Sequence, residues 1–240
     1  MVPKLPKPQS SPVNLLFSRK GRWCKHLFTR VVTKRKRPPE KKTMRTNAKT
    51  EVWSEHLVLV PYQEKHVERY HEWMKDPHLQ EMTASEPLSL ADEYAMQKSW
   101  LEDDDKCTFI VLDRKQYEES SDEVGAMIGD VNLFFNNQDN NREAELEVMI
   151  AEPSNRGKGR GKEVLHLMMR YGIEVLHVGL FTAKIKLSNT VSRKLFESQG
   201  FILASTSSIF QEATYSLDVD EQFQARLRDS TPAYTLKLRH

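Results

Sequence analysis

The sequence predicts an α/β fold (α+β, with a mixed sheet), in which helices flank a central mixed β-sheet. Short β-rich runs alternate with amphipathic stretches in the order strand, two helices, three strands, helix, strand, helix, two strands. This order favours a mixed sheet with helices packed against it. A glycine-rich loop lies between the fourth strand and the next helix. Hydrophobic residues make up 38% of the 240 residues and charged residues 29%, which suits one globular core with polar tails.

The first elements are a strand and two helices. The β-rich run at 56–60 predicts a strand, and an apolar stripe at helical spacing predicts a helix over about 63–75. Residues 82–89 are expected to form a loop. Ser89, with Asp92 three residues later, is a candidate cap for the second helix.

The remaining elements follow from apolar runs separated by polar turns. An exposed polar connection is expected over 113–125, and helices are expected over about 160–177 and 190–199. The other predicted strands cover residues 107–112, 126–135, 145–151, 181–187, 201–209 and 212–219.

Charge divides the chain into an arm and a body. Residues 1–50 contain 15 Lys/Arg and one acidic residue, whereas residues 51–240 contain 21 Lys/Arg and 33 acidic residues. Repeated prolines and a sparse apolar pattern favour disorder in the arm. The predicted division is therefore a basic disordered extension (1–43), a folded domain (44–222) and a polar C-terminal tail (223–240).

Three interpretations of the basic extension stay open. The run at 34–42 fits a nuclear import address or a contact with a polyanion such as nucleic acid. The acid-free stretch at 14–32 fits a mitochondrial transit peptide, and a solvated tail without function is the third interpretation.

Cys24 and Cys107 lack metal-ligand spacing and favour a reducing compartment. We therefore expect a cytoplasmic protein, with nuclear import favoured over mitochondrial import as the alternative. No apolar run approaches the roughly 18 residues of a membrane span.

The glycine-rich loop is Arg156-Gly157-Lys158-Gly159-Arg160-Gly161. The first turn of a helix presents unpaired N–H groups and a positive dipole end, which together favour an anion. Glycines allow close backbone approach to phosphate oxygens, and three cationic side chains add charge. The loop lacks the Ser/Thr and the first glycine of a Walker loop, and it lacks the third glycine of a dinucleotide fingerprint.

The loop resembles the signature of the Gcn5-related N-acetyltransferase (GNAT) superfamily, Arg/Gln-x-x-Gly-x-Gly/Ala. Arg156, Gly159 and Gly161 match it, and the element order of the body is similar to the same fold. A second block, residues 189–201, resembles the Asn-x-x-Ser…Gly-Phe segment of the superfamily. Stretches such as 59–62 and 129–134 resemble one narrower family within it. The resemblance implies a GNAT acyl-CoA N-acyltransferase fold and acetyl-CoA as cosubstrate, without a metal.

The resemblance also implies roles for individual residues. Glu145 and, one pleat further on, Glu147 are the candidate general bases, acting directly or through a water. Phe196 occupies the position at which many members have a tyrosine that protonates the departing thiolate. A phenyl ring has no proton to donate, so this sequence departs from the pattern. The candidate cofactor-binding residues are Val148, Met149, Ile150, Arg156, Gly157, Lys158, Gly159, Arg160, Gly161, Asn189, Ser192 and Phe196.

The leading hypothesis is an acetyl-CoA-dependent N-acetyltransferase, in which an amine attacks the thioester directly. The expected acceptor is a protein or peptide, and an N-terminal α-amine is favoured. An alternative, motivated by Phe196, is a catalytically weak acyl-CoA-binding module that acts through a protein partner. A third is a scaffold that binds a polyanion through residues 1–50, with binding that weakens steeply as salt rises. No membrane partner is expected, and nucleic acid only through the 1–43 extension.

Overall fold

The computed structural model describes residues 44–137, 140 and 142–239. The predictions made for residues 1–43 lie outside this part of the chain. The strands of the described part are β1 (Thr50–Trp53), β2 (Leu57–Pro61), β3 (Lys106–Asp113), β4 (Met127–Phe134), β5 (Glu143–Ile150), β6 (Leu180–Lys186), β7 (Ile202–Ser207), β8 (Glu212–Asp218) and β9 (Thr235–Leu238).

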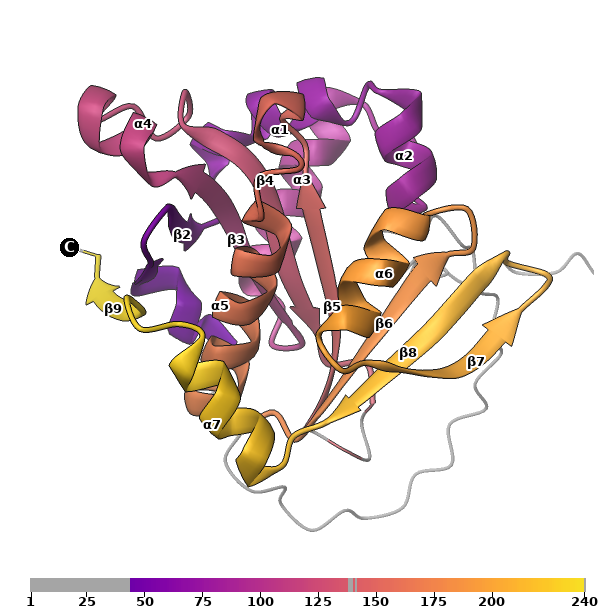
Figure 1. The fold of residues 1–240 in the computed structure, drawn as a ribbon. Helices are drawn as coiled ribbons and strands as arrows, with labels where there is room; N and C mark the ends of the chain where they lie inside the picture. The colour runs from indigo at the N-terminus through magenta and orange to yellow at the C-terminus, as the bar shows by residue number, and fades with distance from the viewer. Residues whose placement is uncertain (1–43, 138–139, 141, 240) are drawn as a thin grey trace, which may run out of the picture.

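These strands form one mixed sheet in the order β7-β8-β6-β5-β4-β3-β2-β1-β9. Neighbours run antiparallel, except that β5 and β6 run parallel. The helices are α1 (Val67–Trp73), α2 (Pro77–Thr83), α3 (Leu90–Glu102), α4 (Arg114–Ser120), α5 (Arg160–Glu174), α6 (Thr190–Ser198) and α7 (Glu221–Asp229). The predicted fold class is thereby confirmed (Figure 1). None of the described helices has the length and apolar character needed to cross a membrane.

Two apolar cores lie on opposite faces of the sheet. Along β3, Cys107, Phe109 and Val111 pack with α5, whereas Ile110 and Leu112 pack with α1 and α3. Successive side chains of a strand point to opposite faces, so a continuous apolar run indicates a strand covered on both sides. Burial raises the pKa of the Cys107 thiol, which therefore behaves as a small apolar residue in the core.

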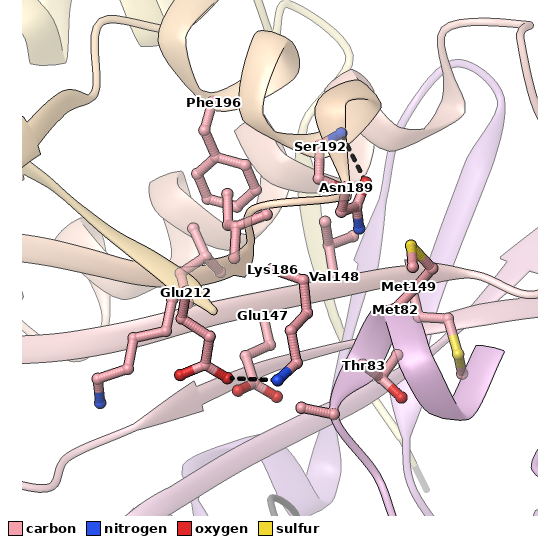
Figure 2. A pocket seen from close by; sticks show the side chains of 14 residues that line it. Met82, Thr83, Glu147, Val148, Met149, Lys186, Asn189, Ser192, Phe196 and Glu212 are labelled. Atoms are coloured by element: carbon pink, nitrogen blue, oxygen red, sulfur yellow. Dashed lines mark hydrogen bonds and ion pairs between the residues drawn. The ribbon is translucent and has the colours of Figure 1, made fainter. Parts of the chain in front are cut away.

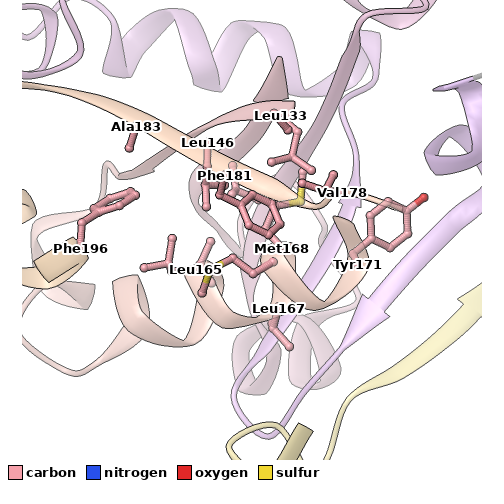
Figure 3. Packing of buried hydrophobic residues seen from close by; sticks show 14 of the residues in the cluster. Leu133, Leu146, Leu165, Leu167, Met168, Tyr171, Val178, Phe181, Ala183 and Phe196 are labelled. Atoms are coloured by element: carbon pink, nitrogen blue, oxygen red, sulfur yellow. The ribbon is translucent and has the colours of Figure 1, made fainter. Parts of the chain in front are cut away.

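Helix α5 fixes the distance between the sheet and the glycine-rich loop at its start. Its apolar stripe places Leu165, Met168 and Tyr171 against Leu133 and Phe181 of the sheet (Figure 3). The Tyr171 ring meets Phe109 edge to face, with ring centroids 5.1 Å apart. Fully burying one such side chain stabilises a protein by about 1.5–3 kcal/mol, so the helix is firmly held.

The sheet opens between its two parallel strands. The register pairs of β5 with β6 are Glu143–Leu180, Ala144–Phe181 and Glu145–Thr182, and the two strands diverge beyond them toward their carboxyl ends (Figure 1). Strand β6 continues to pair with β8 as far as Lys186. The second half of β5 is therefore paired with β4 on one side and open on the other.

Gly129 of β4 allows the neighbouring half of β5 to take its path. A Cβ atom at this position would lie 1.9 Å from the Met149 carbonyl oxygen, a distance that real contacts do not show. Only glycine lets the two backbones approach this closely. The sequence thus encodes the position of Met149 through a residue on another strand.

Several segments differ from the sequence-based expectation: β1 and α2 were not predicted, and residues 82–83, expected in a loop, end α2. The polar stretch 113–125 contains helix α4. Asp113 is its N-cap, and the Asp113 side chain accepts a hydrogen bond from the Gln116 amide. Charged residues along a short exposed helix leave little apolar periodicity to detect.

The expected polar tail at 223–240 is a further difference. Within 223–240, the end of α7 buries Phe223 and Leu227 against the α5 side of the sheet, and β9 pairs with β1. The folded domain therefore extends beyond residue 222. Helix α7 buries only two apolar side chains and β9 has only four residues, so neither gives a clear apolar pattern in a polar segment.

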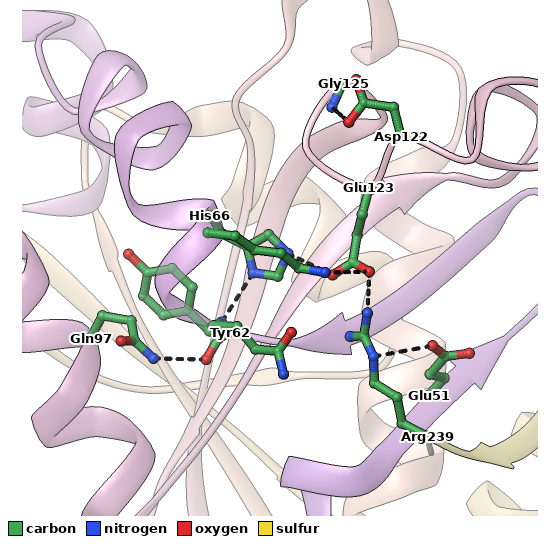
Figure 4. A network of polar contacts seen from close by, with 10 residues as sticks. Glu51, Tyr62, His66, Gln97, Asp122, Glu123, Gly125 and Arg239 are labelled. Atoms are coloured by element: carbon green, nitrogen blue, oxygen red, sulfur yellow. Dashed lines mark hydrogen bonds and ion pairs between the residues drawn. The ribbon is translucent and has the colours of Figure 1, made fainter.

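A network of polar groups ties β9 to the start of the domain (Figure 4). Arg239 forms ion pairs with Glu51 and Glu123, and Lys65 lies 3.0 Å from Glu123. Burial lowers the pKa of His66, so its neutral ring accepts from the Gln63 amide and donates to Glu123 over 2.7 Å. Burial alone would raise the pKa of Glu123, but the bonds from these partners outweigh it and hold the pKa at about 2. The network keeps this edge of the sheet closed at neutral pH.

Phe223→Ala tests whether the C-terminal helix belongs to the folded domain. We expect the free energy of unfolding to fall by about 3–5 kcal/mol, because the substitution empties a buried ring site. The urea midpoint at constant m value measures the change. Arg228→Ala, on the exposed side of the same helix, is the control and should stay within about 0.5 kcal/mol. Equal midpoints for both variants would mean that the segment is a frayed tail.

Candidate active site

A pocket lies where β5 and β6 diverge (Figure 2). Helix α6 borders it on one side and the end of α2 on the other. The lining residues are Met82, Thr83, Ala84, Leu146, Glu147, Val148, Met149, Lys184, Ile185, Lys186, Asn189, Ser192, Phe196 and Glu212.

The floor of the pocket is the open side of β5. Beyond Glu145 the strand has no register pair with β6, so backbone groups at 146–149 face the opening. An exposed strand edge accepts an extended ligand by main-chain hydrogen bonding. A ligand arm that carries amide groups is therefore the chemistry that this floor suits.

The glycine-rich loop begins beyond the end of β5 and leads into α5. Gly157 and Gly159 have φ values of 72° and 78°, and Gly159 is the N-cap of the helix. A left-handed conformation at both positions costs a side-chain-bearing residue about 1–2 kcal/mol, which explains the glycines. The first amide groups of this 15-residue helix have no partner within the helix, a feature that suits an anion.

The three cations of the loop have different partners. Arg156 donates through Nε to the Ile150 carbonyl over 2.8 Å and through a terminal nitrogen to the Ala151 carbonyl over 2.7 Å. Arg160 pairs with Glu163 over 3.3 Å. Lys158 is exposed. Arg156 therefore fastens the loop to β5, and Lys158 is the loop cation best placed to meet an anionic ligand.

Gly161 lies close to both α6 and β5. A Cβ atom there would lie 3.5 Å from Leu195 of α6 and 4.0 Å from Ile150 of β5, which are ordinary contacts. The predicted residue Ile150 thus packs beside the loop and is not among the lining residues. Alanine would fit at this position, as the Gly/Ala alternative of the sequence signature implies.

The two predicted carboxylates occupy different places. Glu145 is buried at the point where the strands separate, and its Oε2 lies 2.6 Å from the Lys184 ammonium. Glu147 is half-buried and lines the pocket, together with the predicted residues Val148 and Met149. The geometry favours Glu147 for contact with a reacting group and Glu145 for holding Lys184.

Helix α6 supplies the opposite wall. Asn189 is its N-cap and accepts a hydrogen bond from the Ser192 amide over 3.0 Å, which leaves the Asn189 amide nitrogen toward the pocket (Figure 2). Phe196 is buried, and its ring meets Phe201 edge to face at 4.9 Å. The wall is therefore apolar at the position where a tyrosine would offer a proton.

Several pocket residues were not predicted from the sequence. Lys184 and Lys186 come from β6, Thr83 from α2, and Glu212 from the start of β8. Glu212 reaches the pocket because β8 lies between β6 and β7 in the sheet, although it follows β7 in the chain. Alternation along a strand signals which side chains share a face, but not which strand becomes its neighbour. Among the described residues, no group of three or more His, Cys, Asp or Glu is placed to hold a metal ion.

The comparison with known proteins agrees with this geometry. A family model described as an acetyltransferase (GNAT) domain matches residues 56–202. The chain belongs to the GNAT family of acetyltransferases. This confirms the superfamily that the loop and the 189–201 block predicted.

Relatives identify the narrower family as N-acetyltransferase 9. The chain is 53% identical over 176 residues to the N-acetyltransferase 9-like protein of Nematostella vectensis, covering 73% of this chain and 89% of that protein. It is 48% identical to the alpha/beta-tubulin-N-acetyltransferase 9 of Homo sapiens, covering 78% and 92%. A spermidine N-acetyltransferase from Vibrio cholerae, solved with CoA and spermine, has a TM-score of 0.58 at 18% identity, covering 72% and 98%. That last likeness shows the fold alone.

The GNAT chain is an acetyl-CoA-dependent N-acetyltransferase, as predicted. Its site fits this cosubstrate on structural grounds. The open edge at 146–149 matches the two amides of the pantetheine arm, and the start of α5 matches the diphosphate. The thioester supplies an activated acetyl group when the cosubstrate is bound.

Gly159→Ala tests the assignment of the anion site. We expect the affinity for CoA to fall by about 5- to 30-fold, because the left-handed N-cap conformation becomes strained by about 1–2 kcal/mol. Isothermal titration calorimetry with CoA measures it. Gly161→Ala is the matched control, since its new methyl group meets only ordinary contacts. A stronger effect of Gly161→Ala than of Gly159→Ala would contradict the assignment.

Proposed function

We propose that this GNAT enzyme transfers the acetyl group of acetyl-CoA to an N-terminal α-amine of a protein. The observation that carries the proposal is the pocket in which Glu147 lies beside the open edge of β5. The relatives named alpha/beta-tubulin-N-acetyltransferase 9 support a protein acceptor and suggest α- and β-tubulin. The cytoplasmic location expected from the sequence suits such an acceptor and is part of the proposal.

In the proposed reaction Glu147 is the general base. Its carboxylate accepts a proton from the acceptor ammonium, directly or through a water. The neutral nitrogen then attacks the thioester carbon, and the new C–N bond forms as the C–S bond breaks. The nitrogen passes its second proton to water, and the departing sulfur takes a proton from water in turn, because Phe196 has none to donate. Val148 and Met149 direct the acetyl group by their position on the open edge.

The first experiment identifies the acceptor. Purified enzyme, acetyl-CoA and purified tubulin dimers are incubated, and N-terminal and lysine-containing peptides are examined by mass spectrometry. We expect acetyl groups on N-terminal amines. Acetylation of lysine side chains alone would refute the α-amine, and no acetylation of tubulin would refute the suggested acceptor.

Glu147→Gln tests the proposed base. We expect kcat to fall by about 10²- to 10⁴-fold with an unchanged affinity for CoA, because an amide cannot accept the proton. Glu145→Gln, the matched change two residues earlier, removes the ion pair with Lys184 and should have the smaller effect on kcat. A larger loss in Glu145→Gln would transfer the role to that residue.

Phe196 favours a second candidate function, a weakly catalytic acyl-CoA-binding module. The buried ring provides no proton for the leaving sulfur. Such a module would bind CoA as tightly as an enzyme but give the same slow turnover in the wild type and in Glu147→Gln. A turnover that falls in Glu147→Gln would therefore favour the enzyme over the binding module.

A further inference from the structure

The pocket is lined by side chains of both charges. Its lining contains two carboxylates, Glu147 and Glu212, and two ammonium groups, Lys184 and Lys186. Lys184 forms an ion pair with Glu145 over 2.6 Å, and Glu145 itself does not line the pocket. The other ammonium group, that of Lys186, lies beside Glu212.

Lys186 and Glu212 form the last register pair between β6 and β8. The Lys186 ammonium lies 3.5 Å from Oε1 of Glu212 and donates a shorter bond, 2.9 Å, to the Phe210 carbonyl. The side chain of Glu212 is 6% exposed, whereas that of Lys186 is 24% exposed at the end of a flexible stem. The carboxylate is fixed, and the ammonium can leave it while keeping its bond to Phe210.

We propose that Glu212 binds the ammonium group of the incoming acceptor, and that Lys186 occupies its place until the acceptor arrives. This inference rests on the proposed function and names the residue that selects a cationic amine. Figure 2 shows the Lys186 ammonium at Glu212, with the Glu147 side chain in the same pocket. An acceptor held by Glu212 lies in the pocket that Glu147 also lines, so binding and deprotonation involve two different carboxylates.

The exchange of one ammonium for another preserves the charge of the pocket. A buried carboxylate that loses its cation is costly, so Glu212 favours an acceptor that brings a positive charge. Lys186 lowers the affinity of every acceptor by competing for the same carboxylate. The two residues therefore act in opposite directions on acceptor binding, which a purely structural ion pair would not do.

Opposite shifts in KM are the test. With a tubulin N-terminal peptide as acceptor, Glu212→Gln should raise its KM roughly tenfold or more, because a charge-assisted bond is lost. Lys186→Gln keeps a donor for the Phe210 carbonyl but removes the charge, and should lower KM severalfold. In both variants kcat should change less than KM, and the affinity for CoA, measured by calorimetry, should stay as in the wild type.

A peptide without an α-amine provides the control. The desamino form of the same peptide is used as a competitive inhibitor, and its Ki should be equal in the wild type and both variants, because it carries no ammonium. KM shifts in the same direction, no shift, or a Ki that moves with KM would each overturn the inference. If Glu212→Gln does not fold, Lys186→Gln decides alone, since only a competing ammonium predicts a lower KM.

Failure of this inference differs from failure of the proposed function. If the wild type does not acetylate the peptide, the acceptor class is wrong. If the wild type acetylates it and the two variants do not shift KM in opposite directions, only the role of Glu212 and Lys186 is wrong.

Discussion

The separation of β5 from β6 is the constraint on which the rest of the site depends. Two parallel strands pair over three residues and then diverge, which leaves one strand edge open inside the sheet. An open edge is ordinarily a liability for a protein, because it invites unwanted pairing. Here helix α6 and the end of α2 border the opening, so that it becomes a pocket of restricted shape.

The elements around this opening are fixed by three residues that lie far apart in the sequence. Gly129 permits the close approach of β4 to Met149, Arg156 fastens the loop to the last carbonyls of β5, and Asn189 caps the helix of the opposite wall. Each of them acts on backbone groups. The site is thus positioned mainly through main-chain geometry, while Glu147, Lys186 and Glu212 provide its charge.

The sequence predicted the strands from β2 to β8, the glycine turns before α5 and the Asn189 cap of α6, because each depends on local spacing, whereas β1, α2, α4, α7 and β9 were not predicted. The strand order could not be predicted, because nothing local indicates that β8 inserts beside β6. The place of Glu212 in the pocket was therefore not predicted. Glu145 and Glu147 shared one predicted face, but their different surroundings depend on where pairing with β6 stops. The C-terminal segment was misjudged because the partner of β9 lies at the other end of the domain.

That last pairing has a consequence for synthesis of the chain. Strand β1 begins at Thr50 and can gain β9 only after residue 238 has left the ribosome, whereas β5, α5, β6 and α6 lie within about sixty residues of each other. Long-range pairing is slow because a long loop must first be closed. The half of the sheet that borders the pocket can therefore assemble during translation, and the opposite margin closes last, when Arg239 reaches Glu123.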